Sequence, residues 1–119
     1  MLRLLAAAAL VAAAALVAAA PAVAQNILGA AYDPAADVIV AEIAYRGTNP
    51  HHRFDVIWNA CHGERPARVT GRLVQDQWRD RAERDYRVRR HLRLDGLPCR
   101  PAVVTLRLGK TALENVYVP

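Results

Sequence analysis

Three of the four histidines and one of the two cysteines lie within residues 51–62, as His51, His52, Cys61 and His62. Imidazole nitrogens suit copper and zinc, so these residues could form a metal site. However, no pair of them has the i,i+4 or Cys-x-x-Cys spacing of common metal sites, and adjacent residues point to opposite faces of an extended segment. We therefore expect an exposed histidine-rich turn and no cofactor. A copper or zinc site on His51, His52 and His62 is the alternative.

A second group with possible chemistry is a row of basic residues in the segment 85–94. In a strand, alternate residues share one face and lie about 7 Å apart. The residues on that face would be Arg87, Arg89, His91 and Arg93. Such a stripe could bind a polyanion, for example the phosphates of lipopolysaccharide or an acidic glycan. Arg68 and Arg72 could extend it on a neighbouring strand. The alternative is an ordinary solvated face that protects an edge strand from pairing.

Trp78 is unusual because it lies in a run of charged and polar residues, 76–81. An exposed tryptophan can anchor a partner, but this one could also fold back over one end of the domain. The partner itself, an envelope component or another protein, is not identified. Nucleic acid is not expected, because the basic row lacks aromatic residues that would stack on bases.

Catalysis has little support in this sequence. The chain contains no serine, which excludes every serine nucleophile. Its 11 acidic residues show no pair at a spacing typical of general acid–base catalysis. A covalently attached haem is excluded because Trp58 stands where the motif Cys-x-x-Cys-His needs its first cysteine. We expect a protein that is not an enzyme.

The first 24 residues have the three zones of a Sec-type signal peptide. Arg3 supplies the positive charge, residues 4–20 are all Leu, Ala or Val, and Pro21 is followed by Ala22-Val23-Ala24. We expect cleavage before Gln25 and a periplasmic or secreted product. If the leader is kept, its apolar run is just long enough to serve as a membrane anchor, which would be the only contact with the membrane.

Removing 24 of 119 residues leaves 95, enough for one domain. That domain would carry 15 basic and 11 acidic residues, a mild excess that does not argue for nucleic acid. Both cysteines, Cys61 and Cys99, lie in it. In an oxidising compartment two cysteines predict one disulfide. The pairing would also remove both thiolates from metal binding or catalysis.

Apolar residues of the remaining chain alternate at a period of two, in short runs separated by turn residues. We expect strands at residues 27–32, 38–46, 52–60, 68–75, 85–94, 102–108 and 113–118. Residues 77–84 could be a long loop or one helical turn. Seven short strands in 95 residues predict an all-β fold, a small immunoglobulin-like β-sandwich, with a closed barrel as the alternative.

Overall fold

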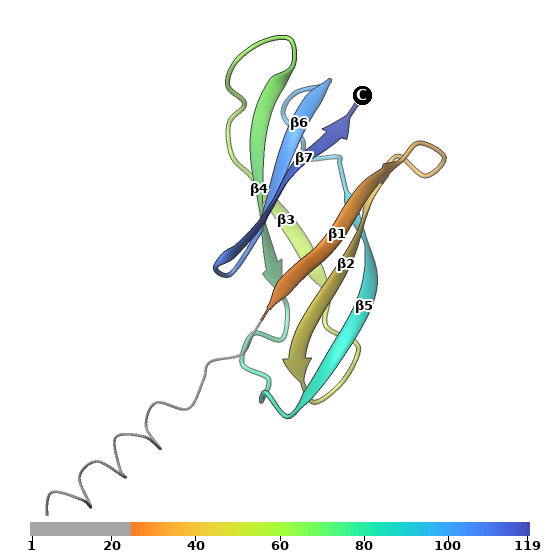
Figure 1. The fold of residues 1–119 in the computed structure, drawn as a ribbon, viewed down its shortest axis with the longest axis vertical. Helices are drawn as coiled ribbons and strands as arrows, with labels where there is room; N and C mark the ends of the chain where they lie inside the picture. Colours follow the sequence, from red (N-terminus) through yellow and green to blue (C-terminus); the bar gives the residue numbers. More distant parts are fainter. Residues whose placement is uncertain (1–24) are drawn as a thin grey trace, which may run out of the picture.

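Two β-sheets make up the protein in a computed structural model that describes residues 25–119 (Figure 1). The predicted signal peptide, residues 1–24, lies outside the described residues. The strands are β1 (Asn26–Asp33), β2 (Val38–Gly47), β3 (Phe54–Trp58), β4 (Ala67–Gln75), β5 (Arg84–Arg93), β6 (Ala102–Leu108) and β7 (Thr111–Val118). The predicted all-β class and its seven strands are confirmed. Residues 77–84 contain turns and no helix, and β3 is shorter than the predicted segment 52–60.

The strands divide between a three-stranded sheet, in the order β1-β2-β5, and a four-stranded sheet, in the order β3-β4-β6-β7. All pairs are antiparallel except β4 and β6, which run parallel. The fold is therefore sandwich-like. Because the immunoglobulin fold is built from antiparallel sheets, the parallel β4–β6 pair departs from the finer type that the sequence predicted.

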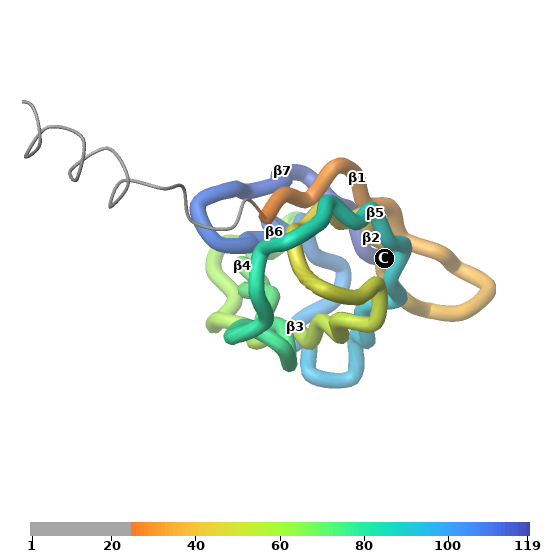
Figure 2. Tube along the Cα trace, turned by 90° about the horizontal axis from the view of Figure 1, so that it is seen from below, coloured from red at the N-terminus to blue at the C-terminus, as the bar shows by residue number. Residues whose placement is uncertain are grey.

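Buried apolar residues of both sheets form one core cluster. Seen from below, the strands are arranged around a common centre (Figure 2). Strand β2 shows why the sequence alternates: its inward side chains Ile39, Ala41, Ile43 and Tyr45 are at most 1% exposed. Burying a large apolar side chain such as isoleucine stabilises the folded state by about 1.5–3 kcal/mol. The four-stranded sheet contributes matching residues, among them Val104 and Leu106 of β6, which are fully buried.

The predicted cysteine pair is confirmed: Cys61 and Cys99 lie at disulfide distance, with their Cα atoms 6.3 Å apart. Cys61 follows β3, and Cys99 lies in the segment 94–101 that crosses from β5 to β6. The link therefore fastens this crossing to the end of the four-stranded sheet. Among the described residues, no helix has the length and apolar character to cross a membrane.

Candidate functional site

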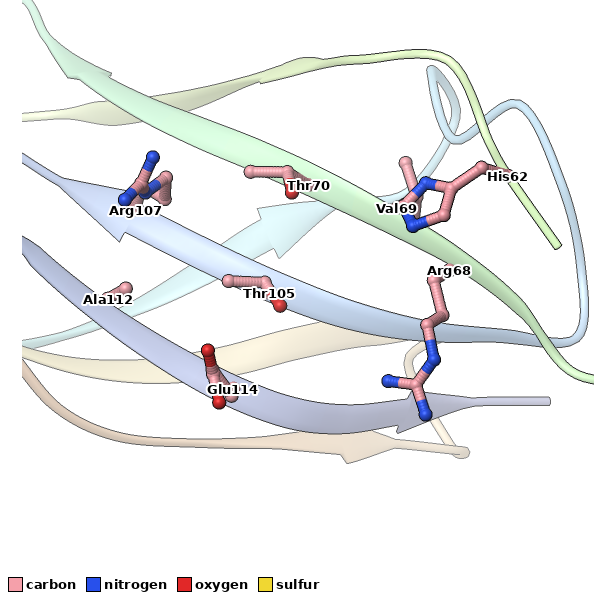
Figure 3. Close-up of a pocket in the computed structure, with 8 residues that line it drawn as sticks. All are labelled: His62, Arg68, Val69, Thr70, Thr105, Arg107, Ala112 and Glu114. Atoms are coloured by element: carbon pink, nitrogen blue, oxygen red, sulfur yellow. The ribbon is translucent and has the colours of Figure 1, made fainter.

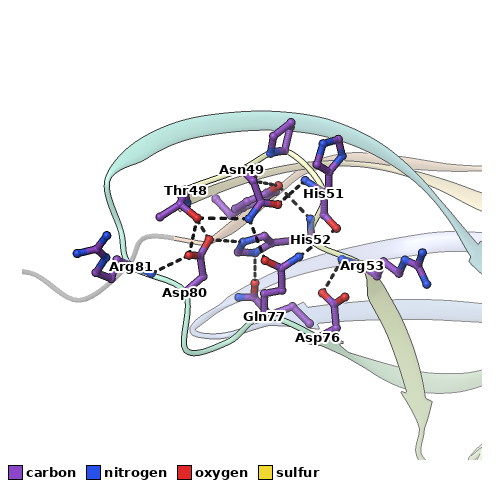
Figure 4. A network of polar contacts seen from close by, with 12 residues as sticks. Thr48, Asn49, His51, His52, Arg53, Asp76, Gln77, Asp80 and Arg81 are labelled. Carbon is purple, nitrogen blue, oxygen red and sulfur yellow. Dashed lines mark hydrogen bonds and ion pairs between the residues drawn. The ribbon is translucent and has the colours of Figure 1, made fainter.

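His52 lies at the centre of a buried polar network at the end of β2 (Figure 4). Its side chain is 1% exposed and stacks on the ring of Tyr45, with ring centres 4.3 Å apart. The Nδ1 atom lies 2.5 Å from Gln75 Oε1, and the Nε2 atom lies 2.7 Å from Asp80 Oδ2. A carboxylate oxygen can only accept, so Nε2 carries a proton. Both ring nitrogens are thus engaged.

Asp80 extends this network to the segment between β2 and β3. The backbone amide and the hydroxyl of Thr48 each donate to its carboxylate, at 2.7 Å. These two bonds, with the bond from His52, hold the pKa of Asp80 well below its usual range. Gly47 packs so tightly here that a Cβ on it would lie 2.8 Å from Asp80 Oδ2. The network therefore holds residues 76–83 against the end of β2.

A side chain of β5, Arg90, also contacts the backbone of this histidine. Arg90 donates from Nε to the carbonyl of His52, at 3.1 Å, and from Nη2 to the carbonyl of Pro50, at 2.7 Å. A His–Asp pair beside a Thr hydroxyl is reminiscent of a hydrolase triad, but its chemistry differs. Thr48 donates to Asp80 and not to His52, and His52 has no free nitrogen to act as a base. We interpret the network as structural.

The histidines of the alternative metal site do not come together. His51 is exposed and His52 is buried, which corrects the expectation that both lie in a solvated turn. His51 and His52 precede β3, whereas His62 follows it, at the opposite end of the strand. Across residues 25–119, no three residues among His, Cys, Asp and Glu are grouped closely enough to hold a metal ion. The three-histidine ligand set is therefore not assembled.

The basic row on β5 is exposed, on a strand that forms one edge of the three-stranded sheet. Its members are Arg87, Arg89, His91 and Arg93. Arg87 Nε lies 3.2 Å from Glu42 Oε1, and Arg93 Nε lies 3.4 Å from Asp95 Oδ1. Arg89 and His91 lie in the middle of the row, and neither forms an ion pair with any residue that the structure describes. Glu42 stands opposite Arg89 in the β2–β5 register, but its carboxylate lies at ion-pair distance from Arg87. The two central residues of the row therefore have no ion pair of their own.

Arg68 and Arg72 do not extend this row, contrary to the sequence-based expectation. They lie on β4, which belongs to the other sheet. There Arg68 borders a shallow depression of about 300 Å³ on the outer face, with Thr70, Thr105, Arg107 and Glu114 (Figure 3). Arg72 does not line it but is in register with Arg107 on the adjacent strand. His62 and Arg68 form an isolated β-bridge at one end of the depression. The depression combines residues of β4, β6 and β7, which no local pattern in the sequence could have joined.

Trp78 is 68% exposed, so it does not fold back over the domain. The guanidinium of Arg79 lies 4.5 Å from the centre of its ring. Together with Leu73 and Leu108, Trp78 lines a depression of about 230 Å³. This is compatible with a partner anchor, which stays a prediction.

A second ionic cluster ties the β1–β2 turn to the segment before β6. Arg100 Nη2 lies 2.6 Å from Asp37 Oδ1, and the hydroxyl of Tyr32 donates to the same oxygen at 2.7 Å. These bonds lower the pKa of Asp37 to about 2. Arg100 also donates from Nε to the carbonyl of Pro119. Through Arg100, the cluster connects the segment that contains Cys99 to the β1–β2 turn and to Pro119 after β7.

Comparison with known proteins adds no function: no protein-family model, no curated protein and no solved structure matches this chain. The residues described above therefore carry the functional argument alone.

Proposed function

We propose that the mature chain, from about Gln25, is an exported binding module without enzymatic activity. Its exposed β5 row would contact an anionic component of the cell envelope. The observation that carries this proposal is the pair Arg89 and His91, which are exposed at the middle of the row and form no ion pair with a described residue, because Glu42, opposite Arg89, is engaged by Arg87. Guanidinium groups bind phosphate and carboxylate oxygens in bidentate fashion, which suits lipopolysaccharide phosphates or an acidic glycan.

The surroundings of the row support a contact surface. On the neighbouring strand, Val38, Val40, Glu42 and Ala44 stand opposite Arg93, His91, Arg89 and Arg87. Three of these four side chains are short and apolar, and the fourth, Glu42, is at ion-pair distance from Arg87. The arginines therefore project beside neighbours that are shorter than themselves. Both ring nitrogens of His52 are engaged and both cysteines are paired, so neither the buried histidine nor a thiolate is free to react, which favours binding over catalysis.

Charge reversal on the row tests this proposal. In the variant Arg87→Glu, Arg89→Glu, Arg93→Glu we expect the loss of retention on immobilised lipopolysaccharide. In the wild type, retention should weaken as salt rises, because ionic contacts at a surface are screened.

A matched control variant changes the net charge equally at other positions: Arg53→Glu, Arg79→Glu, Lys110→Glu. It should be retained nearly as well as the wild type. Equal loss in both variants would mean that only net charge matters, and unchanged retention of the β5 variant would reject the proposal.

A further inference from the structure

The outer face of the four-stranded sheet concentrates arginines that have no acidic partner. Arg72 of β4 and Arg107 of β6 are directly in register on adjacent parallel strands, and Arg68 lies on the same face of β4, about 13 Å from Arg72 along the strand. None of the three side chains forms an ion pair or hydrogen bond with a described residue. Neighbouring strands are about 5 Å apart, so the charges of Arg72 and Arg107 repel each other.

The other arginines of the described chain fall into two groups. Five lie within ion-pair distance of a carboxylate, Arg46, Arg81, Arg87, Arg93 and Arg100, and Arg90 is bound by backbone carbonyls. The rest also lack a carboxylate partner, but among the described strands only Arg72 and Arg107 face each other in register. This pair is therefore the distinct feature, and an anion bound between the two guanidinium groups would remove their repulsion.

A depression beside this pair, between Arg107 and Arg68, offers further polar groups. Thr70 and Thr105 stand opposite each other across β4 and β6, two residues from Arg68 and from Arg107 respectively. Figure 3 shows the two threonines between Arg68 at one end and Arg107 at the other, with Glu114 on the β7 side. A separation of two residues is about 7 Å along a strand, which the long arginine side chains can span.

We propose that this depression binds a phosphorylated polyol, such as a sugar phosphate or a glycerol phosphate group. Arg107, which lines the depression, and Arg72, in register beside it, take the phosphate oxygens, since guanidinium groups bind phosphate in bidentate fashion. Arg68 adds positive charge at the other end of the depression. The threonine hydroxyls donate to the same oxygens. The carboxylate of Glu114 accepts a hydrogen bond from a polyol hydroxyl. This carboxylate distinguishes the proposal from a simple phosphate site, because it would repel an anion that brings no hydroxyl.

This inference does not depend on the proposed role of β5, because the two faces belong to different sheets.

The test is a titration of the mature domain, followed by nuclear magnetic resonance, with glycerol phosphate, inorganic phosphate and glycerol as separate probes. Shifts on β4, β6 and β7 are expected with glycerol phosphate, and the double variant Arg72→Gln, Arg107→Gln should weaken this binding by about ten-fold or more, since two charged hydrogen-bond donors are lost. The control double variant Arg53→Gln, Arg79→Gln should bind as the wild type does.

Glu114→Gln gives the sharper comparison. It should weaken the binding of glycerol phosphate and strengthen that of inorganic phosphate. If it strengthens both, Glu114 is only a repelling charge and the polyol part of the proposal is wrong. The site as a whole is overturned if glycerol phosphate causes no shifts on this face, or if the double arginine variant binds it unchanged.

The phosphorylated polyol could be a free solute or the headgroup of a lipid. Vesicles of phosphatidylglycerol, compared with vesicles of phosphatidylcholine, separate the two sources. Sedimentation with phosphatidylglycerol alone, lost in the Arg72→Gln, Arg107→Gln variant, would support the site with a lipid headgroup as its ligand. Binding of soluble glycerol phosphate without sedimentation would support it with a free solute. The two double variants should also unfold no earlier than the wild type, because they remove surface charges.

Discussion

At the scale of single residues, His52 decides how one end of the sandwich is closed. Within residues 25–119 it is the only polar side chain in the buried core. A buried polar group without partners costs about 1–3 kcal/mol, but here Gln75 and Asp80 engage both ring nitrogens. The histidine thus links the end of β4 and the following loop to β2 without an energetic penalty for its polarity.

The low pKa of Asp80 predicts how this contact responds to acid. The folded state binds the proton less readily than the unfolded chain, because Thr48 and His52 hydrogen-bond the carboxylate. The stability contributed by Asp80 is therefore present above about pH 4 and is lost as the pH falls through its folded pKa. Asp80→Asn should lower the midpoint of thermal unfolding at neutral pH, and the difference from the wild type should shrink in acid.

Thermal unfolding by circular dichroism between about pH 7 and about pH 2 checks this expectation. Asp37, whose pKa is lowered to about 2 by Arg100 and Tyr32, contributes to acid sensitivity in both proteins and cancels in the comparison. Asp55→Asn, an exposed position on β3, serves as the control and should change little. A difference between Asp80→Asn and the wild type that is constant over the whole pH range would contradict the argument.

At the scale of secondary structure, alternation predicted the strands because each strand buries one face. The same alternation contained a signal for His52, which shares the inward parity of Phe54. Pairing between distant strands could not be predicted in this way. The parallel contact of β4 with β6 depends on the packing of the whole sandwich, and without it Arg68 and Arg72 could not be placed beside Arg107. The partners of Asp80 lie 28 and 32 residues away along the chain.

The end of β2 shows how closely these distant elements meet. Gly47 is buried, and an added Cβ would lie 2.8 Å from Asp80 Oδ2 and 2.9 Å from His52 Nε2. Gly47→Ala should therefore displace the pair and destabilise the domain by about 1–3 kcal/mol, as overpacking does. Urea denaturation measures the change. Gly29→Ala on β1 is the matched control, because an added Cβ there meets nothing within 4 Å. Equal stability of the two variants would show that the contact between Gly47, His52 and Asp80 tolerates the added methyl group.

At the scale of the whole molecule, the sandwich presents two basic faces that point away from each other. The β5 row lies on the three-stranded sheet, and the cluster of Arg68, Arg72 and Arg107 lies on the four-stranded sheet. One domain could therefore contact an anionic surface on one side and a phosphorylated ligand on the other. Contact of the β5 row with the cell envelope requires export, so the proposed function depends on the predicted signal peptide.

Export and cleavage can be tested together with the disulfide by one mass measurement. When the chain is expressed from Met1 in a bacterium with Sec export, we expect a periplasmic product with the mass of residues 25–119 less two thiol hydrogens. The reason is the order of Arg3, an apolar run and the small residues Ala22 and Ala24. Cleavage there leaves the fold complete, since β1 begins at Asn26. Ala22→Arg with Ala24→Arg should block cleavage and leave the full-length mass. A wild-type product that keeps residues 1–24 would contradict cleavage, and one that keeps both thiol hydrogens would contradict the disulfide.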